Sequence, residues 1–116
     1  MASELKKDTI KNGDGSTYPK KGDNVTMQYT GWLYDDNAPK NRGKQFDSSV
    51  GRGDFKTKIG VGQVIQGWDQ GVPQMSLGER AVLTIPGHMA YGRDGYPGLI
   101  PQNATLIFEV ELKKIN

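Results

Sequence analysis

The feature that most restricts the fold of this chain is an alternation of inward apolar residues with mostly polar ones near its C-terminal end. The stretch TLIFEVEL (105–112) has this pattern, and VTMQYTGWL (25–33) repeats it earlier in the chain. Side chains of a strand point alternately to its two faces, so a period of two predicts a strand with one buried face. The inner face of the later strand is expected to hold Leu106, Phe108, Val110 and Leu112.

Three further stretches complete the expected architecture. FKTKI (55–59) and RAVLTI (80–85) also favour strands, whereas VIQGWDQGVPQM (64–75) has apolar residues three and four positions apart, which indicates a helix. Gly67 and Gly71 weaken this helix, and Pro73 should end it, so about two turns are expected. The sum is an α+β fold: a mostly antiparallel sheet with one short helix packed across it.

Composition agrees with a small domain rich in turns. The chain has 116 residues with 16 glycines and 6 prolines, which favours short strands over a helical bundle. We expect a single domain over 1–116, in which about 1–20 form a loosely ordered lead-in with one edge strand. A net charge of only +2 argues against a dedicated nucleic-acid binder. No signal peptide or apolar run of membrane-spanning length is found, so we expect a cytoplasmic protein, with the nucleus as a second compartment.

The usual tools of polar catalysis are missing from the sequence. There is no cysteine and a single histidine, which excludes thiolate catalysis and Cys-based or two-His zinc sites. No phosphate-binding glycine motif is complete, and the neighbouring Asp35 and Asp36 lie in a polar loop where solvation is the ordinary interpretation. We therefore expect no metal, no cofactor and no nucleophile.

What remains is a set of aromatic residues and an unusual loop. Each aromatic residue taken alone is best explained as core. The segment YGRDGYPGLIP (91–101), however, combines loop-forming glycines and prolines with two tyrosines and a Leu-Ile pair. Such side chains make sense if the loop overhangs an apolar site. The aromatic residues that could meet there are Tyr29, Phe46, Trp68, Tyr91 and Phe108.

Several of these stretches together resemble a known family. YTGWL, FDSS, VIQGWDQGVPQMSLGER, AYGRDGYPGLIP and ATLIFEVEL are similar to the FK506-binding peptidyl-prolyl cis-trans isomerases, over about residues 10–116. The resemblance is to the small single-domain cytosolic members. It implies a curved five-stranded antiparallel sheet wrapped around one short helix, and a monomeric enzyme that accelerates rotation about X–Pro bonds without cofactor or metal.

The resemblance also assigns roles to residues. Trp68 would form the floor under a proline ring, the Tyr91 hydroxyl and the Ile65 N–H would donate hydrogen bonds, and Asp47 would accept one. The implied catalytic set is Tyr29, Phe46, Asp47, Trp68, Tyr91 and Phe108. The implied binding set for substrate or drug is Tyr29, Phe46, Asp47, Val64, Ile65, Trp68, Tyr91, Tyr96, Ile100 and Phe108. Of the loop residues, Tyr96, Leu99 and Ile100 would form an overhanging flap.

The implied partners are proline-containing peptides and the macrolides tacrolimus and rapamycin. With a drug bound, Arg52, Tyr96 and Leu99 would lie on the surface that meets calcineurin or TOR kinase. Membrane and nucleic-acid partners are not expected. The polar connection between Leu33 and Phe46 is longer than in the shortest family members, and the resemblance gives it no role.

Two other functions stay open from the sequence alone. The chain could be a docking module whose isomerase activity is incidental. It could also be a small nucleic-acid-binding barrel, for which the basic residues would be Lys6, Lys7, Lys20 and Lys21. Pro73, just past the helix, could in addition be a substrate for a second copy.

Overall fold

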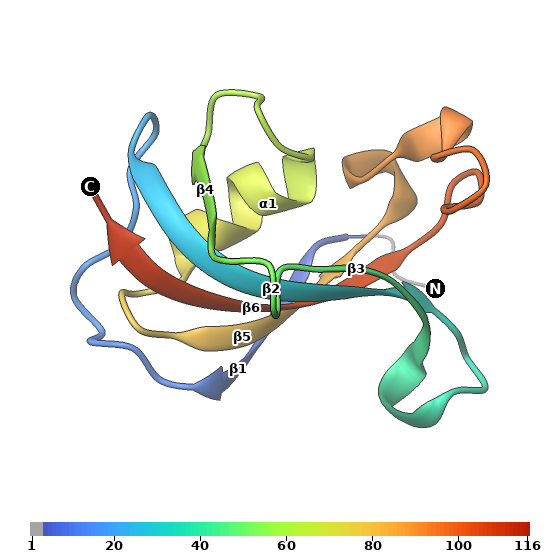
Figure 1. The fold of residues 1–116 in the computed structure, drawn as a ribbon, viewed down its shortest axis with the longest axis horizontal. Coiled ribbons are helices and arrows are strands. Elements are labelled where there is room, and N and C mark those ends of the chain that lie inside the picture. The colour runs from blue at the N-terminus through green and yellow to red at the C-terminus, as the bar shows by residue number, and fades with distance from the viewer. Residues whose placement is uncertain (1–3) are drawn as a thin grey trace.

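A computed structural model describes residues 4–116 and confirms the α+β class. Six strands form one sheet, and one short α-helix packs against it (Figure 1). The elements are β1 (Lys6–Lys11), β2 (Asn24–Tyr34), β3 (Arg42–Ser48), β4 (Phe55–Lys58), α1 (Gln66–Gly71), β5 (Arg80–Ile85) and β6 (Leu106–Ile115). Short 3-10 turns lie at Pro39–Asn41, Val72–Gln74, Gly87–Met89 and Gly92–Asp94.

The sheet is antiparallel and has the order β1-β5-β6-β2-β3, with β4 also paired to β2. The resemblance implied five strands, and the sixth arises because the outer neighbour of β2 is in two pieces. β4 pairs with the first part of β2, from Asn24 to Met27, and β3 pairs with its end, from Thr30 to Tyr34. Residues 49–54 bulge out between the two pieces.

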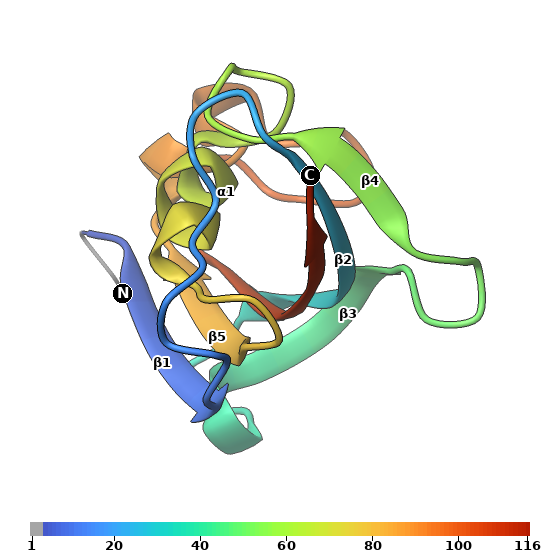
Figure 2. The same cartoon turned by 90° about the vertical axis from the view of Figure 1, so that its left-hand side faces the viewer.

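The sheet curves around α1, which lies on its inner face (Figure 2). The inner face expected for β6 is confirmed, because its four inner residues are at most 3% exposed, but Ile107, which was expected to face outward, is also only 3% exposed. The hydrophobic core thus lies between the inner face and the helix. The side chains buried there without measurable exposure include Met27, Ile59, Val72, Met75, Leu83, Ile85, Leu106, Val110 and Leu112.

The helix is short and lies very close to β5. It ends at Gly71, and Pro73 lies in the 3-10 turn that follows, so the expected end is confirmed. A Cβ atom at Gly67 would lie 2.4 Å from Cγ2 of Ile85. Gly67 lowers the stability of the helix, but its lack of a side chain permits the close contact between helix and sheet. This contact sets the distance of Trp68 from the sheet.

The N-terminal segment contributes the expected edge strand. Of the lead-in over 1–20, residues 1–3 lie outside the described part of the chain. β1 pairs with β5, and its inner side chains Lys7 and Thr9 both donate to the Glu79 carboxylate, at 2.7 and 2.9 Å. The backbone of Asp14 and Thr17 is bonded to Leu77, which holds the turn-rich stretch against the molecule.

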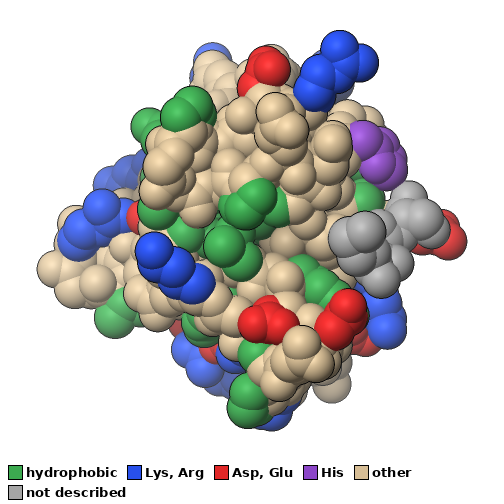
Figure 3. Space-filling view, turned by 90° about the vertical axis from the view of Figure 1, so that its right-hand side faces the viewer, with side chains coloured by type: hydrophobic (Ala, Val, Ile, Leu, Met, Phe, Trp, Pro, Cys, Tyr) green, Lys and Arg blue, Asp and Glu red, His purple; other side chains and the backbone are tan. Residues whose placement is uncertain are grey.

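The right-hand end of the molecule in Figure 1 is formed largely by loops. The segment between β5 and β6 and the connection between β2 and β3 both project there (Figure 1). Seen from this end, apolar side chains gather near the middle of the face, and most of the charged ones lie toward its margins (Figure 3). Within residues 4–116, no helix has the length and apolar character needed to cross a membrane.

Candidate active site

An apolar pocket of about 480 Å³ opens between the inner face of the sheet, the start of α1 and the loop that begins at Tyr91. Its lining residues come from six separate parts of the chain. They are Tyr29, Phe46, Asp47, Phe55, Gly62, Gln63, Val64, Ile65, Trp68, Tyr91 and Phe108. The structure therefore brings together the aromatic residues that the sequence singled out.

Trp68 is the best-supported side chain of this pocket. The ring of Tyr29 lies 4.9 Å from its indole, that of Phe108 5.1 Å and that of Phe55 5.7 Å, all edge to face. Edge-to-face pairs are favourable because the positive ring edge meets the negative ring face. With contacts from three sides and only 5% exposure, the indole is fixed in one orientation at the pocket surface.

Phe46 and Phe108 form one wall, and a glycine makes their arrangement possible. Their rings are 5.5 Å apart and nearly perpendicular. A Cβ atom at Gly31 of β2 would lie 2.7 Å from Cε1 of Phe108 and 2.8 Å from Cζ of Phe46. The sequence YTGWL thus places a residue without a side chain where two rings need the space.

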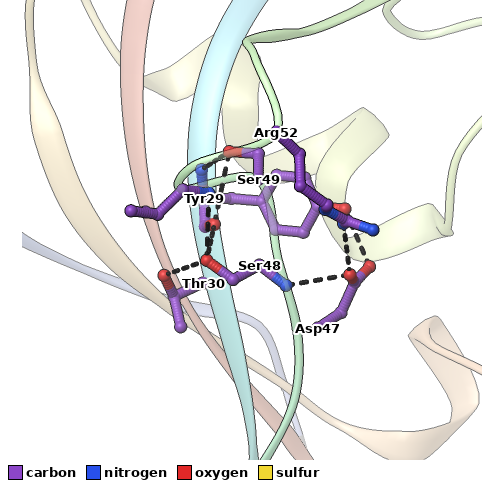
Figure 4. A network of polar contacts seen from close by, with 7 residues as sticks. Tyr29, Thr30, Asp47, Ser48, Ser49 and Arg52 are labelled. Carbon is purple, nitrogen blue, oxygen red and sulfur yellow. Dashed lines mark hydrogen bonds and ion pairs between the residues drawn. The ribbon is translucent and has the colours of Figure 1, made fainter.

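Asp47 connects the pocket to its polar edge (Figure 4). The Tyr29 hydroxyl donates to Oδ2 of Asp47 at 2.7 Å, and Nη2 of Arg52 donates to Oδ1 at 2.8 Å. The Ser48 N–H also donates to Oδ1, at 2.8 Å. With two oxygens already bonded, the carboxylate is held in place and can still accept a further hydrogen bond.

Both pocket tyrosines stay protonated at neutral pH. Burial, together with the hydrogen bond to Asp47, raises the pKa of Tyr29 to about 12. Burial also raises the pKa of Tyr91, and the negative charge of Asp47 acts in the same direction. A neutral phenol keeps its O–H, so each of these groups can act as a hydrogen-bond donor.

The segment before the helix is anchored by Asp69. The Asp69 carboxylate accepts from the N–H of Gly60 at 2.7 Å and from the N–H of Gly62 at 2.9 Å. Both glycines have positive φ, near +80°, which suits glycine. This anchor positions Val64 and Ile65 at the pocket. Ile65 precedes the helix, where N–H groups have no partner within the helix.

The loop that prompted the prediction of a pocket is only partly at its edge. Tyr91 lines the pocket, and its ring meets the ring of Tyr96 at 6.0 Å. Tyr96 and Leu99 are 54% and 38% exposed, but neither lines the pocket. Ile100 was expected in the flap, yet it is 5% exposed and packs in the core, because its backbone pairs in both directions with Tyr96 and forms a tight turn.

Three lining residues were missed by the sequence reasoning. Phe55 carried a usable signal, because its alternation with Thr57 and Ile59 placed it on an inner face. Gly62 and Gln63 carried none, since their position depends on the anchor at Asp69. Among the described residues, no group of three or more side chains is arranged to hold a metal ion.

Comparison with known proteins identifies the class that this fold and pocket define. Residues 15–113 match the model of the FKBP-type peptidyl-prolyl cis-trans isomerases, and the chain belongs to this enzyme family. The resemblance seen in the sequence is thereby confirmed, together with the enzyme class.

Several fungal proteins are similar over nearly the whole chain. FK506-binding protein 1 of Saccharomyces cerevisiae is 58% identical over 117 residues, covering 100% of this chain and 96% of its own. FK506-binding protein 1B of Aspergillus fumigatus is 57% identical, covering 96% and 93%. A peptidyl-prolyl cis-trans isomerase of Schizosaccharomyces pombe is 55% identical, covering 97% and 95%.

Proposed function

We propose that the aromatic pocket is the site at which this isomerase turns X–Pro bonds, with the proline ring on the indole of Trp68. The observation that carries this proposal is the fixed indole: three aromatic rings pack against it at steep angles, and it still lines a pocket of about 480 Å³. A flat, rigid, apolar surface suits a proline ring, which is itself apolar and has little freedom to lose.

The chemistry needs no nucleophile. Rotation about the peptide bond breaks amide resonance, and the barrier is about 18–20 kcal/mol. The twisted amide carries less charge on its oxygen than the planar amide, so it loses less when it leaves water for an apolar pocket. The pocket therefore favours the twisted form. An acceleration of roughly 10⁴-fold requires about 5.5 kcal/mol of such preference.

Polar groups at the rim would hold the flanking chain during rotation. Tyr91 is neutral and lines the pocket, which supports a role in which its hydroxyl would donate to a substrate carbonyl. The Ile65 N–H would donate to a second carbonyl. Asp47, held by Tyr29 and Arg52, would accept from a donor on the bound chain or drug.

The experiment is the isomerisation rate of a Leu-Pro or Phe-Pro tetrapeptide, with and without tacrolimus. We expect acceleration by the protein, and loss of that acceleration at sub-micromolar drug. If the rate stayed at its uncatalysed value, or if the drug left it unchanged, this assignment of the pocket would be wrong.

We further propose that tacrolimus and rapamycin occupy the same pocket and create a composite surface for calcineurin or TOR kinase. Relatives named as FK506-binding proteins support drug binding. The exposed Tyr96 and Leu99, and Arg52 bonded to Asp47, would form the protein part of that surface. Tyr96→Ala should weaken calcineurin inhibition by the drug complex while drug affinity is retained. An equal loss of calcineurin inhibition and of drug affinity would contradict the assignment of Tyr96 to the partner surface.

The protein is also proposed to act as a cytoplasmic monomer. A formal charge of +2 and a described surface without a membrane-spanning helix are compatible with this proposal. Sedimentation equilibrium should give a single species of 12.8 kDa, and a tagged copy should be found in the cytoplasm by microscopy. Concentration-dependent dimers would instead support self-association, for which Pro73 was the candidate.

A further inference from the structure

A second hollow lies on the outer face of the sheet, on the side away from α1. It has a volume of about 750 Å³, larger than that of the aromatic pocket, and shares no residue with it. We call it the outer groove. Its lining residues are Lys6, Asp8, Ile10, Tyr34, Lys40, Asn41, Arg42, Arg80, Val82, Thr84, Ile107 and Glu109.

Strand register builds the floor of the outer groove. Lys6 is paired with Thr84 and Thr84 with Ile107, which places these side chains in one row across three strands. Asp8, Val82 and Glu109 form the next row. Directly opposite residues of neighbouring strands share a face, so the floor combines charged, polar and apolar side chains.

One wall of the outer groove is β1. Its inner residues, Lys7 and Thr9, donate hydrogen bonds to Glu79. Its outer residues, Lys6, Asp8 and Ile10, line the groove. Ile10 lies where the pairing of β1 with β5 is interrupted by a bulge, and it is 53% exposed. An isoleucine held open to solvent beside a groove offers an apolar contact to a partner.

The other wall is the long connection between β2 and β3, to which the family resemblance gave no role. It passes below the sheet in Figure 1. Lys40 and Asn41 have φ of 55° and 60°, a conformation that costs non-glycine residues energy and concentrates at functional sites. The connection is internally bonded: Asp35 N–H donates to the Asn41 carbonyl at 2.9 Å, and Arg42 stacks on Trp32 at 4.5 Å.

Charges in the outer groove favour an acidic partner. Four lining residues are cationic and two are acidic. Glu109 is shared by Arg42 at 3.1 Å and Arg80 at 3.8 Å, while Lys6 and Asp8 are 3.9 Å apart. Within residues 4–116, Lys40 has no carboxylate within ion-pair distance.

We propose that the outer groove binds an extended acidic peptide segment, with carboxylates toward Lys6 and Lys40 and an apolar side chain between Val82 and Ile10. The groove's own carboxylates, Asp8 and Glu109, and its apolar floor argue against binding of a nucleic-acid phosphate backbone, because such binding requires an uninterrupted row of basic residues. The proposal goes beyond isomerisation, since the two sites lie on opposite faces of the sheet. A client chain bound at both would reach the aromatic pocket at raised effective concentration.

The test uses a proline-free probe, Ac-Glu-Glu-Leu-Glu-Glu-NH₂, titrated into the ¹⁵N-labelled full chain at low salt. We expect shift changes at Lys6, Ile10, Lys40 and Val82 that saturate, and that persist when the aromatic pocket is filled with tacrolimus. The double variant Lys6→Gln/Lys40→Gln should weaken binding about fivefold or more, because two exposed charge contacts are lost. The matched double variant Lys56→Gln/Lys58→Gln on β4 should bind as the wild type does.

Several results would overturn the proposal. Equal binding of Ac-Gln-Gln-Leu-Gln-Gln-NH₂ would show that charge is not recognised. Shifts confined to the aromatic pocket, or the same loss in both double variants, would remove the outer groove as the site. Tighter binding of a single-stranded oligonucleotide at the same residues would assign the groove to nucleic acid. Retained isomerase rates in both double variants would establish that they are folded.

Discussion

The indole of Trp68 and the carboxylate of Asp47 represent two different kinds of contribution to one pocket. Trp68 offers apolar surface fixed by three rings, and Asp47 offers one more hydrogen-bond acceptor at the edge. Removing these two side chains should therefore lower the affinity for a largely apolar ligand by different amounts.

Trp68→Ala is expected to lower tacrolimus affinity more than Asp47→Ala does. Removing a large buried aromatic side chain costs about 3 kcal/mol or more, against about 1.5–3 kcal/mol for a hydrogen bond to a charged group. Titration calorimetry gives both values. Because Trp68→Ala also weakens the core, Trp68→Leu serves as a folded reference with an intermediate loss. Equal losses in the two alanine variants would contradict the role of the indole as the floor.

At the scale of single residues, the sequence located most of the pocket and misjudged its rim. Aromatic side chains with inward strand phase, such as Tyr29 and Phe108, were predictable because period and hydrophobicity act locally. Ile100 was not, because its burial depends on a tight turn that no short-range pattern specifies. The sequence predicted that Phe55 faces inward. It did not predict that Phe55 contacts Trp68, because the two residues lie in different elements, β4 and α1.

The loop over residues 60–65 shows how one element positions another. Its backbone is bonded to α1 through the two oxygens of Asp69, and it carries Val64 and Ile65 to the pocket. The helical spacing around Trp68 was predictable, whereas this link between loop and helix was not, since an aspartate in a helix is usually solvated.

Asp69→Asn is expected to lower kcat/KM about tenfold, since an amide nitrogen cannot accept and one hydrogen bond to a charged group, about 1.5 kcal/mol, is lost. Amide hydrogen exchange at Gly60 or Gly62 should become faster in the same variant. Asp8→Asn, an exposed carboxylate on β1, is the control and should change neither quantity. Faster exchange with unchanged catalysis would mean that Asp69 only stabilises the loop.

The split of the sheet edge into β3 and β4 is another property of elements that the sequence did not specify. Residues 49–54 interrupt the pairing, and the two pieces differ in register along β2. The alternation over 55–59 predicted β4, but β3 was missed, because most of it lies in the stretch between Leu33 and Phe46 that was expected to be a polar connection. That both strands pair with β2 is a long-range arrangement. The connection of residues 35–41 is a second example. Its polar residues predicted a loop, but not that this loop forms one wall of the outer groove.

For the molecule as a whole, the attachment of the edge strand β1 involves a buried carboxylate. Glu79 accepts from Lys7, Thr9 and the Ser76 N–H. Burial by itself would raise the pKa of Glu79, but the bonds from Lys7, Ser76 and Thr9 outweigh it, so the pKa is lowered from its ordinary value of 4.5.

This lowered pKa predicts how stability depends on pH. The contribution of Glu79 is complete above pH 4.5, the value for the unfolded chain, and is lost as pH falls through the lower folded-state pKa. Glu79→Gln should therefore destabilise the protein at neutral pH by about 1–3 kcal/mol, and the difference from wild type should shrink in acid. Thermal unfolding between pH 7 and pH 3 measures this.

The matched control is Glu111→Gln, which removes a partly exposed carboxylate 3.4 Å from Arg80. Its effect should stay below about 1 kcal/mol at every pH, as for other surface pairs. A difference between Glu79→Gln and wild type that did not change with pH would show that the charge of Glu79 is not what holds β1.

The chain has two tryptophans, and the sheet separates them. Trp68 lies in the aromatic pocket on the inner side, while Trp32 stacks with Arg42 beside the outer groove. Each indole is therefore a built-in optical reporter for its own side. Exchanging one for phenylalanine leaves a single emitter, so intrinsic fluorescence can follow occupancy of either side of this small barrel-like sheet without any attached dye.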